Sequence, residues 1–294
     1  MTLLNTANDG WYSVFALLCE TVAKKPITEE DLLALCSDGI ETKRIKNTLN
    51  RWTALGLFEK SGGEINFSAF VSGQLGKNHD QLQQKLPGVA RRVLFKKENN
   101  KTFWDSEKSA AADFTRGVSW LLAQDVYEVD LSGHPKVQKL EIDQLSDDKR
   151  LIQNDVRWGG LRTWSKFLGF LTQLGQPLID PTCALREDLP LIFGKSKELA
   201  VSEFCASVAE HLPVLDGGTY RRQVEENLTP ESWRVPGAKH FSTSLSRALK
   251  RLEHDKVIEF KNTADPPDYR DLMGSGGQDW GRVTDVMWKN GAGL

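Results

Sequence analysis

One short motif in this chain, Glu259-Phe260-Lys261, has the residue types of a catalytic site. In metal-dependent nucleases, a strand with this ExK pattern presents its carboxylate to Mg²⁺ and its lysine to the scissile phosphate. Such a site also needs an aspartate on a neighbouring strand, whereas a basic amphipathic helix immediately precedes this motif, where a paired strand would be expected. We therefore interpret the motif as the edge of a small sheet and keep a nuclease as the third hypothesis.

Histidines and cysteines do not form a recognisable metal or nucleophile site. The five histidines show no HxxxH, HxxE or HxH spacing, and the four cysteines form no CxxC pair. A Walker GxxxxGK[ST] motif, a strand-borne GxGxxG and a GxSxG motif are also missing. We therefore predict a protein that is not an enzyme and that has no cofactor and no metal. Separated free thiols are typical of a reducing cytoplasm.

The charge balance excludes a protein that coats nucleic acid without specificity. The chain has 294 residues, with 38 Lys and Arg against 40 Asp and Glu, so no overall positive field attracts polyanions. Any contact with DNA must come from a local patch. No apolar run approaches the ~20 residues of a membrane span, and the early apolar segment lacks the basic flank of a signal peptide. We expect a cytoplasmic protein with no membrane partner.

The first 75 residues have the element order of a winged helix-turn-helix domain. Apolar side chains at helical spacing predict three helices, over residues 11–23, 28–36 and 41–55. Thr28 can cap the second helix, and Gly56 suits the left-handed position that follows the third. Alternating residues on both sides of the turn at 61–63 then predict a hairpin, which would be the wing.

The third of these helices is the candidate recognition helix. Ile45, Leu49 and Trp52 form its apolar stripe, and the outer positions carry side chains that contact phosphates and the edges of adenine or guanine. The predicted DNA-binding residues are Lys43, Arg44, Lys46, Asn47, Asn50 and Arg51. Asp38 and Glu41, near the start of this helix, reduce the net positive charge of the patch. Because winged helices also serve as protein-interaction modules or as plain scaffold, both alternatives stay open.

Residues 76–180 are predicted to form a helical middle domain. Helical patterns extend over residues 82–94, 110–127 and 151–174, and Pro87 is expected to kink or restart the first of them. The third pattern places tryptophans beside arginines, and such residues can stack on unpaired bases. At helical spacing, however, aromatic residues are more typical of a helix core, which is the interpretation that we prefer.

Residues 181–294 repeat the order of the beginning. Short helical pieces precede a basic helix that Ser242 or Ser244 can cap, and this helix carries a second set of predicted DNA-binding residues, Arg247, Lys250 and Arg251. Strands over 257–261 and 282–288 enclose a long wing rich in Gly and Pro. Four aspartates in this wing, Asp265, Asp268, Asp271 and Asp279, outnumber Arg270, which favours contact with a protein over DNA. A loop without a role is the alternative.

Three stretches of the chain, residues 4–10, residues 212–221 and the helix 245–252 with the tip that follows it, resemble the DpdG-like family. Proteins of this family are encoded in bacterial gene clusters that insert deazapurines into DNA and restrict unmodified DNA. The resemblance implies a role in anti-phage defence beside a large ATPase or another subunit of a defence complex. It supplies no catalytic residues.

Together these patterns predict a mainly α protein with winged helix-turn-helix domains at both ends (1–75 and 181–294) and a helical middle domain (76–180). We expect a non-enzymatic subunit of an anti-phage restriction and modification system that binds double-stranded DNA or acts as an adaptor. The alternative is a scaffold of tandem winged helices that docks a large ATPase without contacting DNA.

Overall fold

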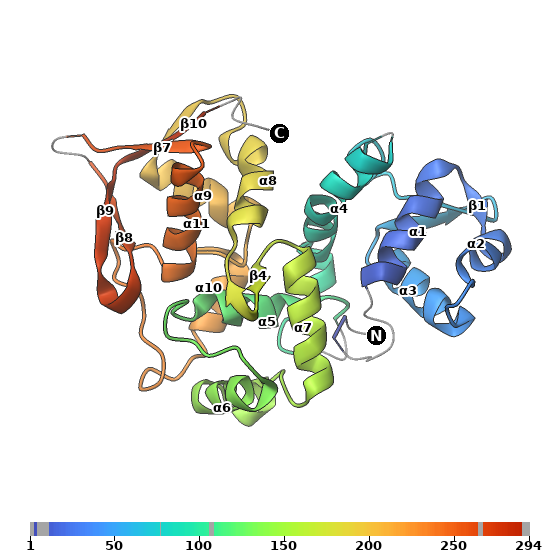
Figure 1. The fold of residues 1–294 in the computed structure, drawn as a ribbon, viewed down its shortest axis with the longest axis horizontal. Coiled ribbons are helices and arrows are strands. Elements are labelled where there is room, and N and C mark those ends of the chain that lie inside the picture. Colours follow the sequence, from blue (N-terminus) through green and yellow to red (C-terminus); the bar gives the residue numbers. More distant parts are fainter. Residues whose placement is uncertain (1–2, 5–11, 77, 106–108, 264–266, 290–294) are drawn as a thin grey trace. The chain divides into compact units, whose positions relative to one another are not determined.

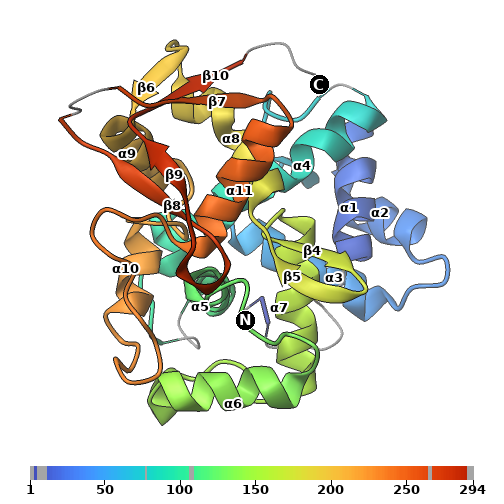
Figure 2. The same cartoon turned by 60° about the vertical axis from the view of Figure 1, so that its left-hand side comes forward.

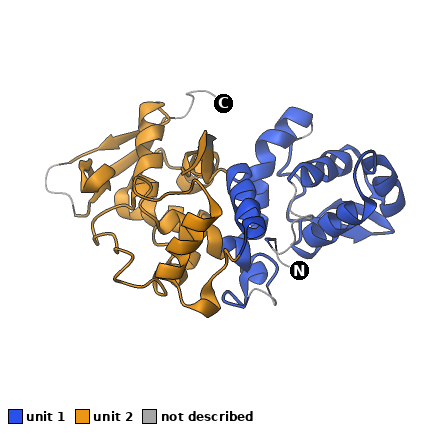
Figure 3. Ribbon diagram, turned by 60° about the horizontal axis from the view of Figure 1, so that its bottom comes forward, with its two compact units in different colours: residues 1–115, 154–168 blue, residues 116–153, 169–294 orange. Residues whose placement is uncertain are grey.

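The computed structural model describes residues 3–4, 12–76, 78–105, 109–263 and 267–289, and this part of the chain is mainly α, as predicted. Within it lie eleven α-helices and four small antiparallel sheets (Figure 1). The chain divides into two units that alternate along the sequence (Figure 3). Unit 1 comprises residues 1–115 and 154–168, and unit 2 comprises residues 116–153 and 169–294. The division into three domains by element order stays a prediction.

Unit 1 contains a module of three helices and a three-stranded sheet, which we call the N-terminal module. Its elements are α1 (Tyr12–Lys24), β1 (Ile27–Thr28), α2 (Glu29–Cys36), α3 (Thr42–Ala54), β2 (Phe58–Ser61) and β3 (Glu64–Phe67). Strand β3 lies between β1 and β2. The side chain of Thr28 accepts a hydrogen bond from the amide of Asp31 (3.1 Å), so the predicted cap of α2 is confirmed.

An aromatic core holds α1 and α3 in place within unit 1. The rings of Phe15 and Trp52 stack with centroids 4.1 Å apart, and Trp164 lies 5.5 Å from Trp52. Both tryptophans are buried. The remaining elements of this unit are α4 (His79–Leu94), η1 (Lys97–Asn100), the first residues of α5 (Ala112–Ala123) and α7 (Asp155–Phe167). Trp164 belongs to this core, which agrees with the preferred interpretation that the aromatic residues of α7 form a helix core.

The structure sharpens two sequence-based expectations for the helices. Of the kink or restart expected at Pro87, the restart does not occur, because α4 runs through this proline as one α-helix. The third helical pattern was expected to reach residue 174, but α7 ends at Phe167. Gly169 has a φ of +81°, and a Cβ there would approach the amide nitrogen of Ala184 to 2.7 Å, so the chain turns at this glycine.

Unit 2 contains a second module of helices and a three-stranded sheet, which we call the C-terminal module. Its elements are α8 (Thr182–Phe193), β6 (Glu198–Ala200), α9 (Val201–His211), α10 (Thr219–Glu225), α11 (Thr243–His254), β7 (Ile258–Lys261) and β10 (Asp285–Trp288). Strand β10 lies between β6 and β7. Outside this module, unit 2 includes the rest of α5, α6 (His134–Gln144), η2 (Asp147–Lys149), β4 (Leu171–Leu174) and β5 (Gln176–Ile179).

The long wing between β7 and β10 has secondary structure of its own. It contains β8 (Arg270–Met273), η3 (Ser275–Gly277) and β9 (Asp279–Val283), and β8 pairs with β9 as a hairpin that lies along α11 (Figure 2). The predicted return strand over 282–288 is therefore two strands, β9 and β10, separated at Thr284. Sequence reasoning missed this hairpin because its bulge and its glycines interrupt the alternation of apolar and polar residues.

Candidate nucleic-acid interface

Helix α3 is fixed along its length and at its end. Ile45, Leu49 and Trp52 are fully buried. At its C-terminal end, the buried side-chain amide of Asn99 donates hydrogen bonds to the carbonyl oxygens of Leu55 (2.9 Å) and Val93 (2.7 Å). Asn99 thereby joins the end of α3 to the end of α4. Its role could not be found from the sequence, where it stands in a lysine-rich polar stretch with no visible partner.

The six predicted DNA-binding residues of α3 do not share one environment. Lys43, Lys46 and Asn50 are exposed, whereas Arg44 and Asn47 are half-buried. The predicted outward position of Arg51 is wrong, because this side chain is only 4% exposed. The buried side of α3 is wider than its apolar stripe and includes Thr48 as well as Arg51. The outer face of α3, defined here as Lys43, Lys46 and Asn50, is what remains accessible.

The outer face of α3 carries positive charge that is open to solvent. Within the described residues, neither Lys43 nor Lys46 forms an ion pair. The adjacent β2–β3 hairpin differs, because Lys60 pairs with Glu29 at 2.6 Å. Exposed ammonium groups without a carboxylate partner can neutralise phosphates, and an exposed Asn can bond to the edge of a base.

Helix α11 is the counterpart of α3 in the C-terminal module. In each case the helix leads into a strand through the same turn, with hydrogen bonds of 2.9 Å from Leu57 N to Trp52 O and from Val257 N to Leu252 O. The second residue before the strand has a positive φ in both, +84° at Gly56 and +57° at Lys256. Each residue of α11 therefore matches the residue of α3 whose number is 200 lower. In this alignment Thr243 and Ser246 match Lys43 and Lys46.

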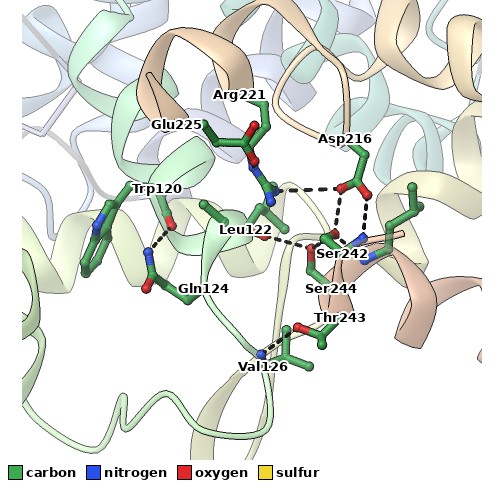
Figure 4. Close-up of polar contacts among 12 residues, drawn as sticks. Trp120, Leu122, Gln124, Val126, Asp216, Arg221, Glu225, Ser242, Thr243 and Ser244 are labelled. Carbon is green, nitrogen blue, oxygen red and sulfur yellow. Dashed lines mark hydrogen bonds and ion pairs between the residues drawn. The ribbon is translucent and has the colours of Figure 1, made fainter. Parts of the chain in front are cut away.

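The start of α11 is held by residues that are far away in the sequence (Figure 4). Ser242 caps the helix by accepting the amide of Leu245 (3.2 Å), so the predicted cap is confirmed. The carboxylate of Asp216 accepts both the amide and the hydroxyl of Ser242, each at 2.6 Å. Ser244 donates to the carbonyl of Leu122 (2.8 Å). These bonds fix the position and direction of the helix from its first turn.

The outer face of α11 is covered by the β8–β9 hairpin. The hydroxyl of Ser246 is fully buried and accepts a hydrogen bond from the amide of Met273 (2.9 Å). Leu272 of β8 is also buried. Thr243, the counterpart of Lys43, accepts a hydrogen bond from the amide of Val126 (3.1 Å). The positions that are free on α3 are therefore used for contacts within the chain on α11.

The predicted DNA-binding residues of α11 all have carboxylate partners. Arg251 and Arg247 form ion pairs with Asp180, Arg247 at 3.7 Å, and Lys250 pairs with Glu253. Asp180 is fully buried and also accepts the amide of Thr182 (3.1 Å). Asp180 precedes the helix by about 70 residues, so no local pattern could reveal it. The binding of DNA by α11 stays a prediction, but its cations are less available than those of α3.

Both arginines of the wing pair with aspartates of the wing. Arg270 pairs with Asp268 at 3.3 Å, and Arg282 pairs with Asp271 at 3.0 Å. The bond to Asp271 raises the pKa of Arg282 further above its ordinary value. Asp265, which was counted among the wing aspartates, lies outside the described residues.

The ExK motif lies on β7 and takes part in ion pairs across the sheet. Glu259 pairs with Lys289, which lowers the pKa of that carboxyl, and Lys261 pairs with Glu198 at 2.6 Å. The neighbouring strand β10 places Asp285 opposite Lys261, so the aspartate that the sequence did not supply is present on a paired strand. In the described ranges, however, no group of three or more His, Cys, Asp or Glu is arranged to hold a metal ion.

Comparison with known proteins gives one family and no individual relative. The family model described as DpdG-like matches residues 1–266. No curated protein and no solved structure matches the chain. The family match associates the chain with a Dpd-type modification cluster. In the described part of the chain, no helix is long and apolar enough to cross a membrane.

Proposed function

The chain belongs to the DpdG-like family, and on that premise we propose that it is a non-enzymatic subunit of a Dpd-type modification cluster that contacts double-stranded DNA through α3. We assign the N-terminal and C-terminal modules as two winged helix-turn-helix domains. Their common order of helices and their matching strand orders, β1-β3-β2 and β6-β10-β7, support this assignment. Helix α3 is then the recognition helix of the first domain.

One observation carries the proposed DNA contact, namely the open outer face of α3. Lys43 and Lys46 lie on consecutive turns, and Asn50 follows one turn later, so the three side chains form a line along the helix. A helix of this width fits the major groove, where lysines reach phosphates or guanine and asparagine pairs with adenine. No comparable line is free on α11, whose matching positions bond to Val126 and Met273.

A salt titration of duplex binding tests this proposal. Each phosphate that a lysine neutralises contributes about −0.9 to the slope of log K against log salt concentration. The Lys43→Ala/Lys46→Ala variant should therefore bind more weakly and should have a slope about 1.8 less negative than the parent chain. A variant with two exposed lysines removed from the loop before β6, Lys195→Ala/Lys197→Ala, is the matched control.

The two variants separate a specific contact from general electrostatic attraction. An equal loss of affinity in both would mean that DNA responds only to net charge, and the assignment of α3 would be wrong. A parent chain that binds no duplex at ~50 mM salt would contradict the DNA contact altogether, because electrostatic binding is strongest at low salt.

A protein scaffold is the second candidate function, and the covered face of α11 favours it. Unit 2 has 20 Lys and Arg against 25 Asp and Glu in sequence, whereas unit 1 has 18 against 15. A domain with a covered recognition helix and an excess of acidic residues is better suited to hold a protein, such as the large ATPase of the cluster, than DNA. Co-purification of that ATPase with the Lys43→Ala/Lys46→Ala chain, after nuclease digestion of DNA, would support the scaffold.

A further inference from the structure

The β2–β3 hairpin places two carboxylates on one side. Lys60 lies opposite Ile65 in the register, and the alternation of strands puts both on the inner side, toward the module. Glu59 and Glu64 lie on the other side, opposite Asn66 and Ser61, and both glutamates are exposed. The outer side of the hairpin is therefore negatively charged.

The hairpin has no free positive charge to offset these carboxylates. Its one basic residue, Lys60, is paired with Glu29 at 2.6 Å. The turn at Gly62 and Gly63 has no side chains that could reach a phosphate. A wing that binds DNA would need cations at these places.

The hairpin cannot move far from a duplex that α3 contacts. Three residues, 55–57, join the end of α3 to β2. The Leu57 amide donates a hydrogen bond back to Trp52 O in α3 (2.9 Å), and the Ser68 hydroxyl donates one to Gly56 O (2.7 Å). A span this short keeps the strands beside the helix. Surface charges interact over ~8–10 Å at physiological salt, so carboxylates held beside α3 can repel the phosphates of a duplex that α3 contacts.

We propose that Glu59 and Glu64 are selectivity residues that weaken the attraction of this module for the sugar-phosphate backbone. Their repulsion lowers affinity for any duplex, so that stable binding depends on the contacts of α3 within the groove. The inference rests on the proposed contact of α3 with DNA. It differs from that proposal because it assigns an opposing effect to a different element.

Removal of the two charges without change of shape tests the inference. The Glu59→Gln/Glu64→Gln chain keeps an oxygen at position 59 to accept the bond from the amide of Ala69 (3.3 Å). We expect its affinity for a random-sequence 20-bp duplex to rise roughly two- to tenfold at ~50 mM salt, and the gain to shrink at ~200 mM salt. The control is Glu226→Gln/Glu231→Gln, which removes two exposed carboxylates from unit 2.

Each outcome has a separate meaning. Unchanged or lower affinity of the Glu59→Gln/Glu64→Gln chain, or a rise no larger than that of the control, would overturn the inference. The proposed function is judged separately by the Lys43→Ala/Lys46→Ala chain and fails if that chain binds as the parent does. When all four changes are combined, the gain should disappear, because the hairpin lies near DNA only while α3 is docked.

Discussion

Helices α3 and α11 stand at the same place in two modules of the same order, yet only α3 has a free outer face. The difference comes from the connections and not from the helices. In the N-terminal module, residues 37–41 join α2 to α3, and a two-residue turn joins β2 to β3. In the C-terminal module, long segments occupy both places, 212–242 and 262–284. These insertions supply the partners of α11, including Asp216 and Met273.

The size of the outer side chains on each helix fits whether the face is covered or open. Ser246 on α11 is small and fully buried, which allows the backbone of β8 to approach and the serine to bond to it. Lysines at such positions would fill the space of the hairpin. The same arrangement of helices and strands can therefore serve either an external ligand or the chain itself, and the inserted loops decide which.

The largest effect on stability is expected when a residue of α11 is replaced by the residue that stands at the matching position of α3, 200 positions earlier. We expect Ser246→Lys to lower the free energy of unfolding by about 3–5 kcal/mol, because it buries an unpaired charge and displaces β8. The reverse change on α3, Lys46→Ser, should alter stability by less than about 0.5 kcal/mol. Urea denaturation of both full-length variants measures the difference. Equal effects would mean that the β8–β9 hairpin does not cover α11 in solution.

Loss of the Asp180 carboxylate, which pairs with two arginines of α11, should have the next largest effect on stability. Asp180→Ala leaves Arg247 and Arg251 without their partner, and we expect a loss of about 2 kcal/mol. The figure is smaller than for a fully buried pair, because the side chains of Arg247 and Arg251 are 24% and 48% exposed and can be hydrated. Asp38→Ala, at an exposed position before α3, is the control and should be nearly neutral. A neutral Asp180→Ala would show that the arginines of α11 are free for an external partner.

The starts of the two helices should respond differently to alanine. Ser242→Ala removes the side-chain cap of α11 and one donor to Asp216, at an expected cost of about 1–2 kcal/mol. At the start of α3, Glu41 makes no side-chain cap bond, so Glu41→Ala should cost less than about 0.5 kcal/mol. Hydrogen exchange at the first amides of α11 should report the loss. A larger effect of Glu41→Ala would reverse this part of the comparison.

A substitution in the turn that follows α11 should have the smallest effect, and it should stabilise the protein. Lys256 is the one residue other than glycine with a positive φ in the described chain, and its counterpart is Gly56. We expect Lys256→Gly to stabilise the protein by about 0.5–1 kcal/mol, because it relieves a left-handed conformation that L residues adopt at a cost. Gly56→Ala should destabilise by a similar amount. Thermal unfolding of both variants, with Lys250→Gly as a control within the helix, checks the sign.

Much of the secondary structure near α3 and α11 could be predicted, because its signals are local. Thr28 and Ser242 mark helix starts through bonds to amides three residues away, and Gly56 marks an end. The candidate site could be predicted only in part. Lys43, Lys46 and Asn50 lie outside as expected, but Arg51 is buried because the contact area of α3 is wider than its apolar stripe.

The sequence by itself determined the mainly α character, the helices and hairpin of the N-terminal module, the basic residues of two helices and the likeness to one family. Only the tertiary structure decided which of those basic residues face solvent. Asp180 reaches Arg251 across 71 residues, and Met273 reaches Ser246 across 27. Caps and periodicity depend on neighbours within a few turns, whereas exposure depends on segments that the fold brings together from far along the chain.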